Sequence, residues 1–136
     1  TEDKDFFTII ASHNGYEKKF GYIHTRSVKI SKKEDKIFGK DELKKTRKNS
    51  LSLICFIRFH IYPNTKIVKT KAGNSILISL PSGEGWSLQS KTNNFEIEKN
   101  IFLGNRNKII NNESVSISKN LSEDTVLINW EIERVS

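Results

Sequence analysis

The sequence predicts an all-β protein, and the expected architecture is an antiparallel β-sandwich of roughly ten or more strands. Short segments in which apolar and polar residues alternate recur along the chain, which is the pattern of strands with one buried face. Turn-forming glycine, proline and asparagine residues separate these segments. The one stretch rich in helix-forming residues, 40–48, has almost no apolar face, so we expect a charged loop there.

The expected strands follow one another with short breaks. In chain order they are 6–11, 20–30, 51–62, 66–70, 75–80, 86–89, 95–98, 108–110, 115–118 and 125–135. The first is rich in phenylalanine and isoleucine, which favour strands. The alternation is clearest in 51–62, where every second residue from Leu51 to Ile61 is apolar or cysteine, while Arg58 and His60 fall on the opposite face.

Turn-forming residues bound the remaining expected strands, and two of these strands carry a tryptophan. Pro63–Asn64 stops the strand before it, and the glycine-containing segments 72–74 and 81–85 are expected to form turns on either side of 75–80. In the last strand, apolar residues share one face with Trp130. Trp86 and Trp130 are therefore expected to be core anchors.

Length and composition predict one domain covering 1–136. A chain of 136 residues can build its own core, and no linker or repeat divides it. It contains no methionine, not even at position 1, which suggests a C-terminal fragment of a longer protein. The acidic, polar N-terminus has no signal-peptide character, and no stretch approaches the ~20 apolar residues of a membrane helix, so no membrane partner is expected.

The charge balance favours polyanionic partners. Lysine and arginine outnumber aspartate and glutamate by 23 to 16, which gives a net charge of +7. Such an excess suits nucleic acid, acidic polysaccharide or an anionic surface, without choosing among them. Interleaved aromatic and basic residues at 16–20 and 58–60 keep single-stranded nucleic-acid binding open as the least favoured hypothesis.

The sequence offers no motif of a self-contained active site, so no catalytic residue is predicted. His13, His24 and His60 form no H-x-H or H-E-x-x-H pair, and neither a G-x-S-x-G nucleophile motif nor a phosphate-binding loop is present. Cys55 is the single cysteine, which excludes an intrachain disulfide. It lies in an apolar run and is expected to act as a small buried hydrophobe.

Three ordered blocks of sequence carry a family resemblance. They are ASHNGY at 11–16 with FGYIHTR at 20–26, IRFHIYP at 57–63, and LPSGEGW at 80–86, and the ending INWEIER at 128–134 adds a fourth segment. Together they resemble blocks of the bacterial heparinase II/III-like polysaccharide lyases, in the same order. The resemblance extends from 11 to 135 and is similar to the C-terminal β-sandwich region of that family.

What this resemblance implies is an accessory region of a lyase. The family's β-sandwich follows an α/α-toroid domain, which would be the partner of this chain, and the enzymes cleave uronate-containing polysaccharides, such as glycosaminoglycans, by β-elimination. A base removes the proton α to the uronate carboxylate, and an acid assists the departing glycosidic oxygen. The family's catalytic histidine, tyrosine and asparagine have no counterpart here, so the 136 residues are expected to be inactive alone. The parent would be bacterial, in the periplasm or the cytoplasm.

The resemblance also implies candidate site residues. His24 is the candidate ligand of a structural zinc that the longer protein would hold through two histidines and an aspartate, with the other ligands upstream of this chain. No cofactor is expected in the fragment itself. Tyr16, Arg26 and Arg58 are the candidate substrate-binding residues, because Tyr16 would face the cleft and both arginines could pair with carboxylates.

Two alternatives to the accessory role stay open. A free-standing carbohydrate-binding module would bind glycans tightly without the rest of a lyase. A single-stranded nucleic-acid-binding domain would bind oligonucleotides with strongly salt-dependent affinity.

Overall fold

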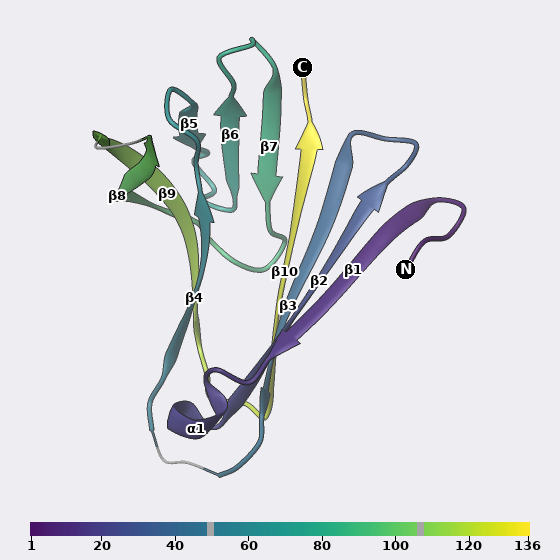
Figure 1. Ribbon diagram of the computed structural model, residues 1–136, viewed down its shortest axis with the longest axis vertical. Coiled ribbons are helices and arrows are strands. Elements are labelled where there is room, and N and C mark those ends of the chain that lie inside the picture. The colour runs from purple at the N-terminus through teal and green to yellow at the C-terminus, as the bar shows by residue number, and fades with distance from the viewer. Residues whose placement is uncertain (49–50, 106–107) are drawn as a thin grey trace.

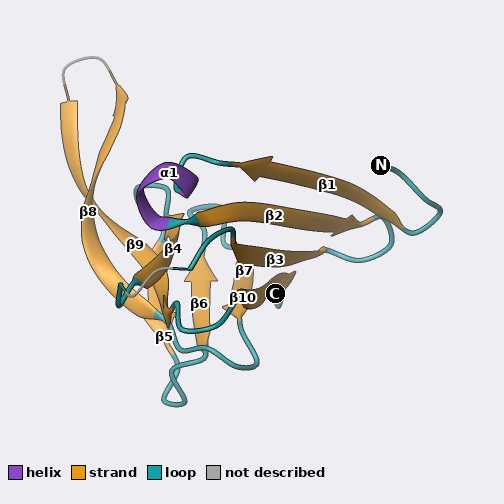
Figure 2. Cartoon of the chain, turned by 90° about the horizontal axis from the view of Figure 1, so that it is seen from below, coloured by secondary structure: helices purple, strands orange, loops and turns teal. Residues whose placement is uncertain are grey.

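The computed structural model describes residues 1–48, 51–105 and 108–136, which form ten β-strands and one short helix (Figure 1, Figure 2). The predicted all-β fold is thereby confirmed. In the residues that the structure describes, no helix is long and apolar enough to span a membrane. The elements are β1 (Phe6–His13), α1 (Glu17–Phe20), β2 (Tyr22–Ser31), β3 (Lys36–Lys45), β4 (Ile54–His60), β5 (Lys66–Lys69), β6 (Ser75–Ser79), β7 (Gly85–Gln89), β8 (Glu96–Asn105), β9 (Lys108–Asn120) and β10 (Thr125–Arg134).

The strands form two antiparallel sheets of unequal size. The larger sheet has seven strands in the order β1-β2-β3-β10-β7-β6-β5, and the smaller has three in the order β4-β9-β8. Figure 1 shows the two sheets as separate layers, with β4 and β9 facing β10 and β3. The core lies between these layers, as the sequence predicted for a sandwich.

Alternation of apolar and polar side chains explains why the strands pack in this way. In β10, Val126, Ile128 and Trp130 are buried, while the intervening Leu127 and Asn129 are exposed. Side chains on successive residues of a strand point to opposite faces. The predicted inner face of the last strand is therefore confirmed.

The predicted faces of β4 are confirmed in the same way. Ile57 is buried, and Cys55 and Phe59 are half-buried against the core. Phe56 and Arg58 are exposed on the opposite side. Cys55 is a free cysteine that packs as a small apolar side chain, as expected.

Trp130 is the largest side chain of the core. Its backbone partner on β3 is Gly39, and a Cβ atom at position 39 would lie 2.0 Å from Cε2 of the indole. The glycine therefore provides the space in which the indole lies across the strand. Phe59 of the smaller sheet meets the same indole edge-on, at 5.0 Å between ring centroids. Trp130 thus links the two sheets.

One segment differs from its predicted structure. Residues 40–48 were expected to form a charged loop, but most of them belong to β3, an interior strand between β2 and β10. Asp41 and Leu43 are buried on its inner face, whereas Lys40 and Lys44 are exposed. The loop prediction was wrong because a buried carboxylate occupies a position at which an apolar residue was expected.

Smaller differences concern the ends of the predicted strands. Residues 17–20 form the single turn of α1, and β2 begins only at Tyr22, after Gly21 with φ of 75°. The predicted strands 108–110 and 115–118 are parts of the one long strand β9, which pairs with β8. Trp86 is half-buried and does not belong to the core cluster, to which Leu88 contributes from the same strand, so the prediction that Trp86 anchors the core was wrong.

The smaller sheet leaves part of the larger one uncovered. The inner face of β1 carries Phe7 and Ile9, which pair with Ile30 and Val28 of β2. Val28 packs against the core, so these residues share the core-facing side. Nevertheless Phe7 is 45%, Ile9 61% and Ile30 38% exposed. The apolar face of the larger sheet therefore extends beyond the strands that cover it.

Candidate functional site

A fully buried carboxylate is the centre of the polar cluster between the sheets. Asp41 of β3 is 0% exposed. Its Oδ1 atom accepts hydrogen bonds from Nε2 of His24 at 2.7 Å and from Nε of Arg26 at 2.7 Å. Its Oδ2 atom accepts one from Nε1 of Trp130 at 2.9 Å and one from Nη2 of Arg26 at 3.2 Å.

The pairing of three adjacent strands explains this cluster. Arg26 and Asp41 are direct cross-strand partners on β2 and β3, and His24 lies two residues before Arg26 on the same face. Trp130 lies on β10, on the other side of β3, where its indole reaches Asp41 from the opposite direction. A buried charge is tolerated when hydrogen bonds and an opposite charge compensate for its lost hydration, and here both do.

Two opposing effects determine the pKa of Asp41. Burial by itself raises the pKa of the carboxyl, because the charged form loses its hydration. Hydrogen bonds from Arg26, Trp130 and His24 stabilise the charged form and outweigh burial, so the pKa lies below its ordinary value. Asp41 is therefore a carboxylate at neutral pH.

A directional chain of hydrogen bonds leads from Asp41 to the surface. The backbone N–H of Gly15 donates to Nδ1 of His13 at 3.2 Å, so the proton of a neutral His13 ring is assigned to Nε2. That N–H donates to Nδ1 of His24 at 3.2 Å, and His24 then donates through Nε2 to Asp41. Asp41 thus orients both imidazoles, and His13 is the exposed end of the chain.

The predicted site residues line one open groove. Tyr16, His24, Arg26 and Arg58 border a hollow of about 420 Å³, together with His13. Tyr16 is 46% exposed, and its ring meets that of His13 at 5.0 Å between centroids. The structure therefore brings together four residues that lie in three separate segments of the sequence.

The two arginines of the groove have different surroundings. Arg26 is fixed by its two hydrogen bonds to Asp41, and its guanidinium lies 5.9 Å from the indole centroid of Trp130. Arg58 lies on the exposed face of β4, where Nε donates to Glu98 at 3.1 Å and the guanidinium covers the ring of Phe56. The side chain of Arg58 is 46% exposed and that of Arg26 is 39% exposed, so Arg58 is slightly more accessible to a ligand.

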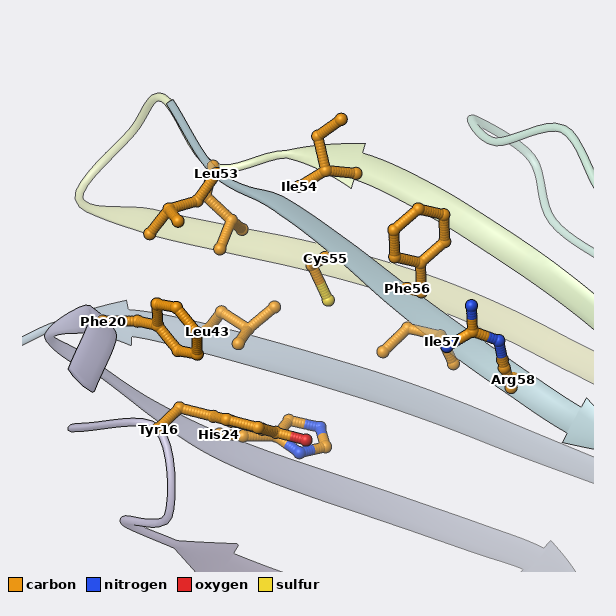
Figure 3. Close-up of a pocket in the computed structure, with 11 residues that line it drawn as sticks. Tyr16, Phe20, His24, Leu43, Leu53, Ile54, Cys55, Phe56, Ile57 and Arg58 are labelled. Atoms are coloured by element: carbon orange, nitrogen blue, oxygen red, sulfur yellow. The ribbon is translucent and has the colours of Figure 1, made fainter. Parts of the chain in front are cut away.

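A second, apolar groove of about 340 Å³ adjoins the first (Figure 3). Figure 3 shows Phe20, Leu43, Leu53 and Cys55 gathered between α1, β3 and β4. Burial raises the pKa of the Cys55 thiol to about 11, and the negative charge of Asp41 adds to this effect. Cys55 is therefore a protonated, poorly nucleophilic thiol at neutral pH.

The described residues do not by themselves fit a zinc site. In residues 1–48, 51–105 and 108–136, no group of three or more histidine, cysteine, aspartate or glutamate side chains is arranged to hold a metal ion. Both ring nitrogens of His24 already have partners, Asp41 and His13. A structural zinc site normally requires four ligands. The assignment of His24 to zinc stays a prediction about a longer protein.

The sequence analysis missed two members of this cluster. Asp41 was overlooked because its segment was taken for a loop, although Ile37, Gly39, Asp41 and Leu43 fall on one parity of a strand. His13 was considered with the other two histidines but was not selected as a site residue, because its position opposite His24 is a consequence of strand register that sequence spacing does not show. His60 lies elsewhere, where its Nδ1 accepts a hydrogen bond from Asn100.

Comparisons with known proteins agree with the fold. A family profile described as "Heparinase II/III-like, C-terminal" matches residues 1–131. The crystal structure of a heparan sulfate lyase from Pedobacter heparinus superposes with a TM-score of 0.83 at 13% sequence identity, covering 100% of this chain and 21% of that chain. A heparinase III gene product superposes with a TM-score of 0.78 at 16% identity, covering 98% of this chain and 20% of its own.

The structural matches show a fold shared with one region of longer lyases. At such identities the structural likeness shows the fold, and the chain spans about one fifth of the length of the lyases that it resembles. No curated protein sequence matches the chain. The family profile, however, covers nearly all of the 136 residues. The chain therefore belongs to the heparinase II/III-like family, and it corresponds to the C-terminal region of that family.

Proposed function

We propose that this chain is the accessory C-terminal β-sandwich domain of a lyase that cleaves uronate-containing, acidic polysaccharides by β-elimination. The family match over residues 1–131 carries the proposal. The structural relatives have about four fifths of their length outside the matched region. In this proposal the catalytic groups lie on that other part, the α/α-toroid, against which the present domain packs.

The chemistry of the polar cluster supports a non-catalytic role for the described residues. β-Elimination requires a base that reaches the proton α to the uronate carboxylate. Asp41 is fully buried and accepts hydrogen bonds from three side chains, so it cannot contact a sugar. The nitrogens of His13 and His24 that face each other are engaged in the chain that ends at Asp41.

The open polar groove would then form one wall of the substrate cleft. Tyr16 provides a half-exposed aromatic ring, and Arg58 provides a guanidinium that can bind a uronate carboxylate or a sulfate. Arg26 would contact the substrate only through the part of its guanidinium that does not face Asp41. The net charge of +7 favours approach of a polyanion to this wall.

A lyase assay tests where the catalysis lies. The isolated 136 residues are incubated with heparan sulfate and with other uronate-containing polysaccharides, and the ultraviolet absorbance of unsaturated uronate products is followed. We expect no turnover by this chain and turnover by the longer polypeptide that contains it. Robust turnover by the 136 residues alone would overturn the accessory role.

Substitution of Arg58 tests the cleft wall. In the longer polypeptide, Arg58→Ala is expected to raise KM for an acidic polysaccharide roughly fivefold to tenfold with a smaller change in kcat, because about 1–1.5 kcal/mol of charge-assisted hydrogen bonding is lost. Arg134→Ala is the matched control, since Arg134 is also an exposed arginine paired with carboxylates but lies outside the groove. Equal effects of the two substitutions would show that only net charge matters.

The half-exposed Tyr16 beside the arginines also fits a free-standing carbohydrate-binding module. Isothermal titration of the isolated chain with heparan sulfate fragments separates this second candidate from the accessory role. Tight binding by the 136 residues alone would favour the module, and binding that appears only in the longer polypeptide favours the accessory domain.

A further inference from the structure

One edge of the smaller sheet lies beside the apolar groove. Among the described residues, β4 pairs with β9 alone and is the terminal strand of its sheet. A terminal strand presents a row of backbone N–H and C=O groups without strand partners, and such an edge accepts another extended segment. The edge of β4 is therefore competent to bind one more strand.

The groove below this edge is apolar along most of its length. Phe20 and Leu43 line it on the side of α1 and β3, and Leu53 and Cys55 line it on the side of β4 (Figure 3). Leu121 also lines the groove. A groove of this composition suits apolar side chains better than it suits sugar hydroxyls. An extended segment that binds the edge would place every second side chain in the groove.

An extended segment that pairs with the edge of β4 would also cover exposed apolar residues on the other face of this strand. Ile54 is 57% and Phe56 is 47% exposed, and both border the groove. Cross-strand neighbours on an added strand would cover them, as aromatic and β-branched pairs do within sheets. One added strand with apolar residues on both faces would therefore pair with the free edge, fill the groove and cover these two side chains.

The charges around the groove determine which kind of strand fits. The ammonium of Lys19 lies 5.2 Å from the ring of Phe20, and the guanidinium of Arg58 lies 4.9 Å from the ring of Phe56. Arg58 is also paired with Glu98 at 3.1 Å, whereas Lys19 has no ion pair among the described residues, so the end of the groove beside Phe20 is the more basic one. A second copy of this chain, with its net charge of +7, would bring like charges together, whereas a segment with an acidic residue at the end beside Lys19 would be attracted.

We propose that the edge of β4 from Ile54 to Ile57, with the apolar groove below it, binds a β-strand from the part of the lyase polypeptide that lies outside this chain. That strand has alternating apolar residues and an acidic residue near the end that lies beside Lys19. It extends the smaller sheet to four strands and covers Ile54 and Phe56. The polar groove beyond Arg58 stays open. The inference rests on one part of the proposed function, that this chain is continuous with a longer polypeptide.

Hydrogen–deuterium exchange measured by mass spectrometry tests the proposal, because it reports backbone hydrogen bonding rather than side-chain cover. Peptides that include 53–58 are compared between the isolated chain and the longer polypeptide. We expect exchange at least tenfold slower in the longer polypeptide. The matched control is β6, which has strand partners on both sides within this chain and should exchange equally in both proteins.

Substitution of Phe56, exchange in the isolated chain and sedimentation together identify what binds the edge of β4. Phe56→Lys should restore fast exchange of 53–58 in the longer polypeptide, whereas Leu77→Lys, at an equally exposed position on β6, should not. Fast exchange of 53–58 in the unsubstituted longer polypeptide would overturn the proposal. Slow exchange in the isolated chain would also overturn it, in favour of a second copy if sedimentation shows a dimer and of closure by the chain itself if it shows a monomer.

The proposed function is tested separately by the lyase assay on the same longer polypeptide. Slow exchange at 53–58 without lyase activity would leave the strand-binding edge supported and the lyase assignment refuted. Lyase activity with fast exchange at 53–58 would support the lyase assignment and refute the strand-binding edge.

Discussion

Replacement of Asp41 by asparagine tests whether the buried carboxylate organises the inner face of the larger sheet. Asparagine keeps the shape but has one acceptor oxygen where aspartate has two, and its amide nitrogen would face a donor, either Trp130 or Arg26. Breaking a buried charge pair from one side costs about 3–5 kcal/mol. The side chain of Arg26 is 39% exposed and can recover hydration, so we expect the lower end, about 3 kcal/mol.

Urea denaturation followed by tryptophan fluorescence measures this loss, because Trp130 lies in the cluster. A loss of about 3 kcal/mol corresponds to a decrease of roughly 10 °C in Tm for a chain of this size. Glu42→Gln is the matched control, since it makes the same chemical change at the neighbouring position, on the opposite face of β3. We expect the control to change the free energy of unfolding by less than about 0.5 kcal/mol.

The pH dependence of the same difference gives a second, independent check. The pKa of Asp41 in the folded protein lies below its ordinary value of 3.8, so the unfolded chain binds the proton more readily than the folded one. The stability that the charged carboxylate provides is therefore complete at neutral pH and is lost as the pH falls below 3.8 through the folded-state pKa. A difference between the native protein and Asp41→Asn that is below about 1 kcal/mol at pH 7, or that stays constant into strong acid, would refute the reasoning.

Three further outcomes follow from packing and from the state of the thiol. Gly39→Ala should lower the free energy of unfolding by at least about 1–3 kcal/mol in urea, because the added Cβ would lie 2.0 Å from the indole of Trp130; an unchanged midpoint would contradict the close approach. Ile128→Ala, at a fully buried position, should cost about 2–5 kcal/mol, whereas Leu127→Ala, at an exposed position on the same strand, should cost less than about 0.5 kcal/mol; equal costs would mean that the two faces of β10 are misassigned. Cys55 should react with iodoacetamide at pH 8 at least ~100-fold more slowly in the folded chain than in urea. The reason is that its pKa is raised from 9.0 to about 11 and only the thiolate reacts. Equal rates in a mass-spectrometric time course would show an accessible thiolate.

Much of the fold could be predicted from alternation and turn chemistry. The inner face of β4 and the apolar face of β10 were predicted correctly, because a strand with one buried face must alternate. The turns around β6 were also predicted, since glycine and asparagine at 72–74 can adopt the backbone conformations that tight turns require, and Gly73 has φ of 79°. Local residue chemistry determines these features, so no knowledge of distant contacts was needed.

The candidate site was only half predictable. Tyr16, His24, Arg26 and Arg58 were singled out through the family resemblance, and the structure places all four around one groove. Whether Tyr16 and the arginines bind substrate stays a prediction, as does the role of His24 in metal binding. Asp41 was missed because its charge hid the alternation of its strand.

By itself, then, the sequence determined the fold class, most of the strand faces and the family to which the chain belongs. Only the tertiary structure decided how the polar residues around Asp41 are paired, because their partners are distant in sequence. Asp41 is a stable buried carboxylate only because β2 and β10 bring Arg26, His24 and Trp130 to it from two sides. The free edge of β4 likewise follows from the order of strands in the sheets, which local residue preferences do not specify.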